Sequence, residues 1–193
     1  MQNIAVFCGS SEGYNELYRE TAFDLGAMLA SRGIGIVYGG AKVGLMGAVA
    51  EAALQQGGRV TGVIPRFLEH KEIVHDGLTK LISVDTMHER KLQMNRLCDG
   101  VIALPGGWGT MEELFEMLTW GQLGLHRKPI GLLNINGFYD ALLALCSNMV
   151  QEGFLDECVN TSLLASPSAD ELLDMMERYT PPPVPKWLTE RTT

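Results

Sequence analysis

Short apolar runs alternate with longer amphipathic stretches along most of the chain. The apolar runs have no polar face, which is typical of strands buried on both sides of a parallel sheet. The longer stretches repeat apolar residues at helical spacing. We expect strands at about 3–8, 34–38, 59–64, 80–84, 101–104, 129–133 and 162–166, and helices at about 14–31, 86–98, 110–123, 138–152 and 168–179, with one more that runs from a glycine-rich turn at 39–47 to about 56.

Regular alternation of strands and helices with short connections predicts the fold class. We expect one α/β domain of the doubly wound, Rossmann-like type, with helices on both faces of a parallel sheet. The domain should span 1–180, and the proline-rich residues 181–193 should form an extended tail. The polar segment 66–78 should loop irregularly over the edge of the sheet. In this fold class, ligands bind at the carboxyl ends of the strands.

Composition and charge disfavour several classes of function. The 193 residues carry a net charge of −8, which argues against a general nucleic-acid or anionic-membrane binder. An anionic ligand therefore needs a local pocket. The four cysteines show no C-x-x-C spacing, no signal peptide precedes Ile4, and no apolar stretch is long enough to span a bilayer. We expect a protein of the reducing cytoplasm.

Residues 100–119 contain the clearest candidate site. A short apolar strand ends at Pro105, glycines follow at 106, 107 and 109, and a helical pattern starts at Thr110. A strand, a glycine loop and a helix N-terminus in this order build an anion site from free N–H groups and the helix dipole. We therefore expect a phosphate to bind here.

Two common uses of glycine loops are disfavoured. Neither 39–47 nor 106–111 fits G-x-G-x-x-G, and the chain has no Gly-Lys-Ser/Thr. NAD and ATP are thus poor candidates. The glycines at 39–47 have a second interpretation, in which they allow a helix and a strand to pack closely.

Two motifs carry a family resemblance. Residues 105–113 match P-G-G-x-G-T-x-x-E, and residues 87–91 match M-H-x-R-K. In both motifs, and from the first strand to about Phe154, the chain resembles the LOG family of cytokinin riboside 5′-monophosphate phosphoribohydrolases. The resemblance implies hydrolysis of the N-glycosidic bond of purine or cytokinin nucleoside 5′-monophosphates, such as AMP or N6-prenyl-AMP, with release of the base and ribose 5-phosphate. It also implies a homodimer, with no metal and no cofactor.

Arg90 is the first catalytic candidate. At 100° per residue, Arg90 falls on the apolar arc of its helix together with Met87, Met94 and Leu97. A guanidinium there needs an anion beside it, because it cannot lose its charge. That anion is either a ligand at the glycine loop or the carboxylate of a structural ion pair. Lys91, at the edge of the arc, is placed to reach the same anion.

Glu113 is the second catalytic candidate. From spacing alone, Thr110 and Glu113 form a capping box at the start of a helix. The resemblance instead makes Glu113 the carboxylate that stabilises the developing positive charge on the ribose and aims a water. Arg90 then orients Glu113 and the substrate or helps the base to leave. The amides of Gly107, Gly109 and Thr110 hold the phosphate.

Further residues are candidates for substrate contact. Glu112 is expected to bind substrate hydroxyls, and Thr119 and Glu72 follow from the family resemblance. The full set of predicted substrate-binding residues is Ser10, Gly40, Glu72, Arg90, Lys91, Gly106, Gly107, Trp108, Gly109, Thr110, Met111, Glu112, Glu113 and Thr119.

The helix at 110–123 is apolar around most of its circumference. Such a helix is buried on more than one side, so one side is expected to contact a second subunit. Two rival functions stay open. One is a nucleotide-binding or cofactor-carrying protein of the same fold without catalysis, and the other is a pyridoxal-phosphate lysine decarboxylase.

Overall fold

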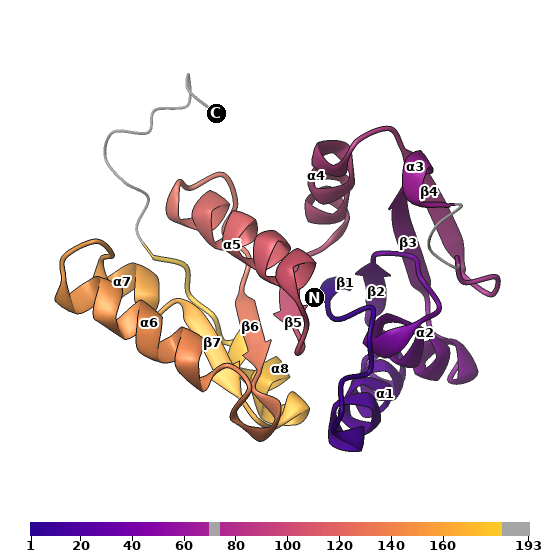
Figure 1. The fold of residues 1–193 in the computed structure, drawn as a ribbon, viewed down its shortest axis with the longest axis horizontal. Coiled ribbons are helices and arrows are strands. Elements are labelled where there is room, and N and C mark those ends of the chain that lie inside the picture. The colour runs from indigo at the N-terminus through magenta and orange to yellow at the C-terminus, as the bar shows by residue number, and fades with distance from the viewer. Residues whose placement is uncertain (70–73, 183–193) are drawn as a thin grey trace.

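The computed structural model describes residues 1–69 and 74–182. In this part of the chain, seven parallel strands form one sheet in the order β4-β3-β2-β1-β5-β6-β7 (Figure 1). The strands are β1 (Asn3–Phe7), β2 (Gly35–Tyr38), β3 (Val60–Pro65), β4 (Lys80–Val84), β5 (Gly100–Ala103), β6 (Ile130–Leu133) and β7 (Leu163–Ser166). The helices are α1 (Glu16–Ser31), α2 (Gly44–Gln55), α3 (Arg66–Glu69), α4 (Met87–Leu97), α5 (Trp108–Gln122), α6 (Asp140–Gln151), α7 (Glu157–Asn160) and α8 (Ala169–Glu177), with a 3-10 turn η1 (Ile135–Gly137).

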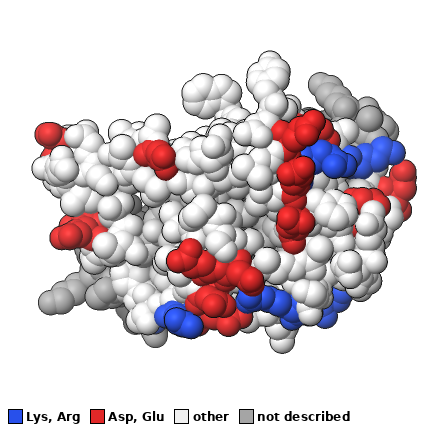
Figure 2. Space-filling model, turned by 90° about the horizontal axis from the view of Figure 1, so that it is seen from below, with Lys and Arg blue, Asp and Glu red and all other residues white. Residues whose placement is uncertain are grey.

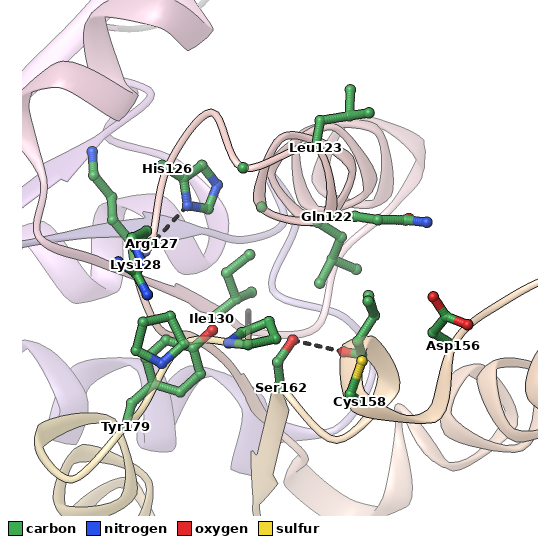
Figure 3. A pocket seen from close by; sticks show the side chains of 16 residues that line it. Gln122, Leu123, His126, Arg127, Lys128, Ile130, Asp156, Cys158, Ser162 and Tyr179 are labelled. Carbon is green, nitrogen blue, oxygen red and sulfur yellow. Dashed lines mark hydrogen bonds between the residues drawn. The ribbon is translucent and has the colours of Figure 1, made fainter. Parts of the chain in front are cut away.

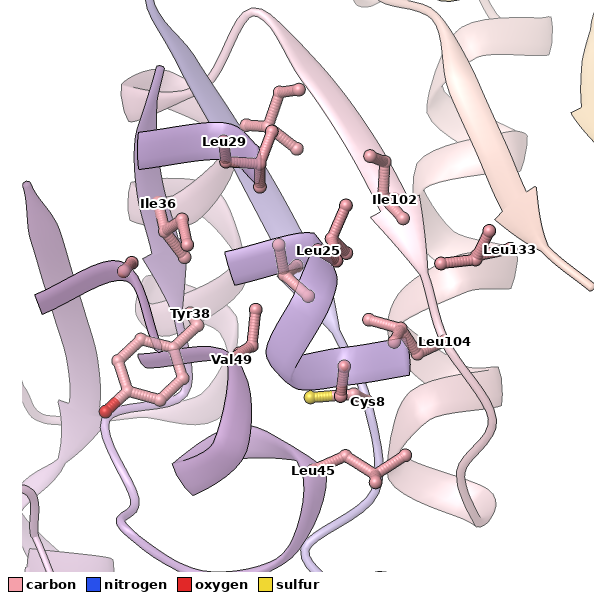
Figure 4. Close-up of a cluster of buried hydrophobic side chains, with 14 of the residues drawn as sticks. Cys8, Leu25, Leu29, Ile36, Tyr38, Leu45, Val49, Ile102, Leu104 and Leu133 are labelled. Carbon is pink, nitrogen blue, oxygen red and sulfur yellow. The ribbon is translucent and has the colours of Figure 1, made fainter. Parts of the chain in front are cut away.

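Helices cover both faces of the sheet, as expected for the doubly wound class. One core cluster joins side chains of α1, α2 and α8 to the sheet, and Figure 4 shows part of it around Leu25, Val49 and Ile102. A second cluster joins side chains of α4, α5 and α6 to the opposite face. The predicted α/β fold is therefore confirmed, and all seven predicted strands are present.

The strand order places a crevice beside the central strand. From β1 the chain winds outward through β2, β3 and β4, and it then returns to β5 on the other side of β1. The helices that follow β1 and β5 consequently pack on opposite faces of the sheet, and the loops that lead to them start side by side at the carboxyl ends of these two strands. This is the position at which doubly wound proteins bind their ligands.

Local residues explain where α1 ends and where α8 begins. Gly33 ends α1 with φ of 71°, and the N–H of Ile34 donates to the carbonyl of Leu29, which together form a glycine C-cap. Ser168 caps α8 by accepting from the Glu171 N–H. The Glu171 carboxylate, however, accepts from the Ser166 hydroxyl, so the capping box is not reciprocal.

The structure contains three short elements that the sequence pattern did not predict. These are α3, within the segment expected to be irregular, and η1 and α7. Each has only three or four residues, too few for an apolar period to be visible. Of the predicted tail at 181–193, residues 183–193 lie outside the described residues. Figure 2 shows one face of the molecule, on which acidic side chains outnumber basic ones, in line with the net charge.

Candidate functional site

The glycine turn after β5 leads directly into α5. Gly107 is the N-cap and Trp108 the first helical residue, so the helix starts before the predicted Thr110. The first bond inside the helix runs from the Met111 N–H to the Gly107 carbonyl, at 3.1 Å. The amides of Trp108, Gly109 and Thr110 thus precede the first intrahelical donor and have no carbonyl partner within the helix. These three N–H groups lie at the positive end of the helix dipole, an arrangement that favours an anion. Two of them, Gly109 and Thr110, are among the amides predicted to hold the phosphate.

The early start of α5 also changes the interpretation of Glu113. The predicted capping box of Thr110 and Glu113 is wrong, because Thr110 already lies inside the first turn and the N-cap is Gly107. Glu113 is 9% exposed and lies six residues after the cap. Its carboxylate therefore does not cap the helix.

Two loops meet at the carboxyl ends of β1 and β5. The Gly9 N–H donates to the Pro105 carbonyl at 3.0 Å. A Cβ on Gly106 would lie 2.1 Å from Thr110 Oγ1 and 2.9 Å from the Gly9 nitrogen. Only glycine permits this approach, so Gly106 packs closely against the side chain of Thr110 and the backbone of Gly9.

The second glycine turn, 39–47, packs against the first loop. The N–H groups of Leu45 and Met46 donate to the Gly9 carbonyl at 3.1 and 3.4 Å. Gly44 has φ of 61°, and a Cβ on it would lie 2.3 Å from the carbonyl carbon of Ser10. The first amides of α2 are therefore used for packing, which supports the structural interpretation of this turn.

Arg90 and Glu113 lie together between α4 and α5. Thr86 caps α4, because its Oγ1 accepts from the Glu89 N–H, and the Glu89 carboxylate accepts from the N–H of Asp85, the residue before the cap. One turn later, Arg90 is 7% exposed, and its Nη2 lies 3.6 Å from Glu113 Oε1. The predicted partner anion of Arg90 is thus the other catalytic candidate.

The guanidinium of Arg90 keeps unused hydrogen-bonding capacity. Its Nη1 lies 3.9 Å from Met87 Sδ, and its Nε has no hydrogen-bond partner among the described residues. The Nη2 contact with Glu113 is longer than a normal charge-assisted hydrogen bond. A buried guanidinium with five donors is costly to leave in this state, so the geometry favours a ligand acceptor beside it.

Gly39 is a site residue that the sequence analysis missed. A Cβ at this position would lie 2.3 Å from Arg90 Nη2 and 3.0 Å from Met46 Sδ. The guanidinium therefore lies directly against the backbone at the end of β2. The only signal in the sequence was the pair Gly39-Gly40 after a buried strand, which did not indicate Arg90 as the neighbour.

Lys91 and Glu112 are also brought together. The Lys91 ammonium, on α4, forms ion pairs with Glu112 and, at 3.1 Å, with Glu116 on α5. Burial alone would lower the pKa of Lys91, but the hydrogen bonds and charges of these two carboxylates together raise it above its ordinary value. Lys91 consequently remains an ammonium ion. Glu116 was not a candidate, although its spacing of four from Glu112 places both on one face of α5.

The thiol of Cys8 lies near the site but is not reactive. It follows β1 in the core, and burial together with the charge of Glu113 raises its pKa far above the ordinary range. Burial and the nearby Cys8 likewise raise the pKa of Tyr38. A thiol in such surroundings stays protonated, so nucleophilic catalysis by Cys8 is disfavoured.

The other predicted substrate-binding residues differ in position. Trp108 is 92% exposed at the lip of the turn, whereas Met111 is half-buried one turn further on. Thr119 lies nine residues after Thr110, about 14 Å along the helix axis, and its hydroxyl donates to the Phe115 carbonyl. Within a single chain, Thr119 therefore lies away from the glycine turn.

Three further predicted positions are Ser10, Gly40 and Glu72. Ser10 is exposed beside the glycine turn, and Gly40, with φ of 87°, accepts from the His75 N–H. Glu72 lies outside the described residues. A cavity of about 710 Å³ opens on the far side of the Ser10 loop, lined by residues that include Ser10, Lys42 and His75.

Another cavity of about 450 Å³ lies at the opposite edge of the sheet. Arg127, Tyr179 and Ser162 line it, close to the amino ends of β6 and β7 (Figure 3). Neither Arg90 nor Glu113 contributes to its wall. It is therefore separate from the site at the glycine turn.

Two negative findings concern the described residues only. Across 1–69 and 74–182, no three His, Cys, Asp or Glu side chains are grouped so as to hold a metal ion. Within the same ranges, none of the helices combines the length and the apolar composition that a bilayer crossing needs.

Fold and site define a single-domain α/β protein of the doubly wound class, with a glycine turn and a buried Arg–Glu pair at its crevice. A family model described as "Possible lysine decarboxylase" matches residues 46–176. The cytokinin riboside 5′-monophosphate phosphoribohydrolase LOG2 of Arabidopsis thaliana is 46% identical over 93% of this chain and 84% of its own length. The phosphoribohydrolase LOG of Oryza sativa subsp. japonica is 46% identical over 93% of this chain and 74% of its own length. The chain therefore belongs to the family of cytokinin riboside 5′-monophosphate phosphoribohydrolases, the LOG family.

Solved structures with the same fold are more distant in sequence. The molybdenum cofactor binding protein from Rippkaea orientalis superposes with a TM-score of 0.69 at 22% identity, covering 92% of this chain and 96% of that one. The molybdenum cofactor carrier protein from Chlamydomonas reinhardtii gives 0.67 at 17% identity with the same coverage. At such identities the likeness shows the fold alone.

Proposed function

We propose that this protein hydrolyses the N-glycosidic bond of purine or cytokinin nucleoside 5′-monophosphates, giving the free base and ribose 5-phosphate. One observation carries the proposal: Arg90 and Glu113 are buried together at 3.6 Å, with Glu113 on the helix that begins at the glycine turn. The names of relatives that are 46% identical over nearly the whole chain support the same reaction.

The phosphate is held by the N-terminus of α5. The amides of Trp108, Gly109 and Thr110 donate to its oxygens, and the helix dipole favours its negative charge. Cβ atoms on Gly107 and Gly109 would meet nothing within 4 Å, so the surface above the turn is open to a ligand. Anchoring the phosphate positions the ribose and its bond to the base over the Arg–Glu pair.

Bond cleavage then depends on the two buried side chains. As the C–N bond breaks, its electron pair leaves with the base, and the ribose develops the positive charge of an oxocarbenium-like transition state. The Glu113 carboxylate stabilises this charge and orients the water whose oxygen bonds to the anomeric carbon. Arg90 holds Glu113 and offers its remaining donors to the substrate, and the base takes up a proton as it leaves.

The lysines do not support decarboxylase chemistry. A Schiff-base lysine needs a lowered pKa, whereas the pKa of Lys91 is raised by its two carboxylates. Lys42 lies at the surface and pairs with Asp76. A purely carrying role, the other alternative, gives no reason to bury Arg90 and Glu113 together.

We further propose that two copies associate through the outer face of α5. Trp108, Met111, Phe115 and Leu118 follow one another at helical spacing and remain partly or fully exposed in the single chain, with Phe115 38% exposed. We expect the dimer to work in the cytoplasm on a soluble nucleotide.

Release of free base from AMP and N6-prenyl-AMP tests the reaction. Glu113→Gln and Arg90→Ala should each lower kcat by at least about 100-fold, in proteins that still melt in one cooperative transition. Arg96→Ala, an exposed arginine on the same helix, is the matched control and should keep full activity. Full activity in Glu113→Gln would return this residue to a structural role.

A further inference from the structure

A single lysine joins the two helices that carry the Arg–Glu pair. Lys91 is only 7% exposed, and its ammonium group contacts one carboxylate oxygen of Glu112 and one of Glu116. Lys91 follows Arg90 on α4, and Glu112 precedes Glu113 on α5. The Arg90–Glu113 pair and the ion pairs of Lys91 thus both connect α4 to α5.

The spacing of the two carboxylates gives this bridge a defined geometry. Glu112 and Glu116 are four residues apart, so they lie about 6 Å from one another along α5 and on one face. An ammonium held between them resists both sliding of α4 along α5 and rotation of α5 about its axis. The register of the two helices is the quantity that sets the distance from Arg90 to Glu113.

The two bridges are unequal. Lys91 makes close contacts with both partners, whereas Arg90 approaches Glu113 only to 3.6 Å and leaves its Nε without a partner among the described residues. The ion pairs of Lys91 therefore hold α4 and α5 together more firmly than the contact between Arg90 and Glu113 does. Arg90 keeps donors for a ligand, which a tightly saturated guanidinium would not have.

We propose that Lys91 and Glu116, together with Glu112, form a positioning clamp that fixes α4 against α5 and so sets the Arg90–Glu113 geometry. The proposal rests on the function proposed above, because it assigns these residues to the support of that reaction. Lys91 then acts through Arg90 and does not contact the substrate.

Steady-state kinetics on AMP test the clamp. Lys91→Met keeps the length of the side chain without its charge, and Glu116→Gln is the milder change, since Glu116 is partly exposed. We expect kcat to fall at least tenfold in Lys91→Met and about fivefold in Glu116→Gln, with KM for AMP within about threefold of wild type. The double variant should be no slower than Lys91→Met, because both changes break one connection.

The chain offers a matched control for the loss of an ion pair. Arg32 joins α1 to Asp170 and Asp174 of α8, which are also four residues apart, on the other face of the sheet. Arg32→Met removes the same kind of bridge, more exposed to solvent, and should leave kcat unchanged. A KM raised tenfold or more in Lys91→Met would make Lys91 a substrate ligand and overturn the proposal, as would an unchanged kcat.

A measurement that needs no enzymatic turnover tests the clamp independently of the proposed reaction. Double-mutant cycles on melting temperature give the coupling between Arg90 and Glu113, in wild type and in the Glu116→Gln background. The clamp predicts that this coupling falls by at least half in the variant, and an unchanged coupling refutes it. If the wild type releases no base from any nucleoside monophosphate tested, the proposed function fails, and the cycles still decide whether the clamp exists.

Discussion

Replacing Gly39 by alanine is the sharpest probe of the site, because it displaces Arg90 without touching it chemically. The new methyl group would lie 2.3 Å from Arg90 Nη2, the atom that faces Glu113. To restore ordinary contact at about 3.4 Å, the guanidinium must retreat by roughly 1 Å. Gly39 does not have a positive φ, so alanine fits its backbone conformation.

The expected magnitude follows from that displacement. A shift of about 1 Å in a positioned group costs on the order of 100-fold in rate, which corresponds to ~2.7 kcal/mol of transition-state stabilisation. Stability should change little. The clash falls on the flexible end of a side chain, and alanine restricts the unfolded chain by about 0.4–1 kcal/mol in favour of folding. We therefore expect a melting temperature within about 3 °C of wild type.

The assay is release of adenine from AMP, with two comparisons. Gly121→Ala makes the same substitution in α5, where the nearest atom is a ring carbon of His126 at 3.2 Å, and it should keep wild-type activity. In an Arg90→Ala background, Gly39→Ala should have no further effect, because the side chain that it displaces is absent. An equally large loss in both backgrounds would refute the reasoning.

Three further outcomes test the site and its surroundings. Gly106→Ala should lose about 1–3 kcal/mol of stability in denaturant unfolding, because its Cβ meets Thr110 Oγ1 and backbone, whereas Gly107→Ala should leave stability unchanged and raise KM for AMP. Phe115→Asp should convert a dimer to a monomer in size-exclusion chromatography at micromolar concentration, and a wild type that elutes only as a monomer would contradict the proposed interface. Burial opposes ionisation of Asp99, but the N–H groups of residues 2 and 3 that donate to it lower its pKa below 3.8. Its stabilising effect is thus present above pH 3.8 and lost as the pH falls through the folded-state pKa, so Asp99→Asn should reduce the melting temperature at pH 7 and lose this difference near pH 2.

The sequence predicted the sheet because its strands are short, continuous apolar runs, which few other structures accommodate. It misplaced the start of α5 for a local reason. Gly-Trp-Gly is a poor helix-forming sequence, and Thr110 with Glu113 imitates a capping box. The glycines nevertheless belong to the first turn, where the helix leaves its amides free.

The candidate site was predicted in part. Helical periodicity placed Arg90 on a buried arc, and the two motifs selected Glu113, but nothing local gave their separation. That distance depends on how α4 and α5 pack over β1, which is a tertiary property. Gly39 and Glu116 were missed for the same reason, since each matters only through a neighbour from a distant segment.

The glycines around the turn separate into two kinds, and the difference bears on function. Gly44 and Gly106 are required by the fold, because a Cβ on each would collide with backbone atoms. Gly107 and Gly109 have open space at the Cβ position, and neither has a positive φ. Gly109 lies inside α5, where glycine costs about 1 kcal/mol relative to alanine. Since the folded chain gains nothing from glycine there, the gain must come from something that approaches the backbone closely, and the phosphate of a nucleotide at the helix N-terminus satisfies that requirement.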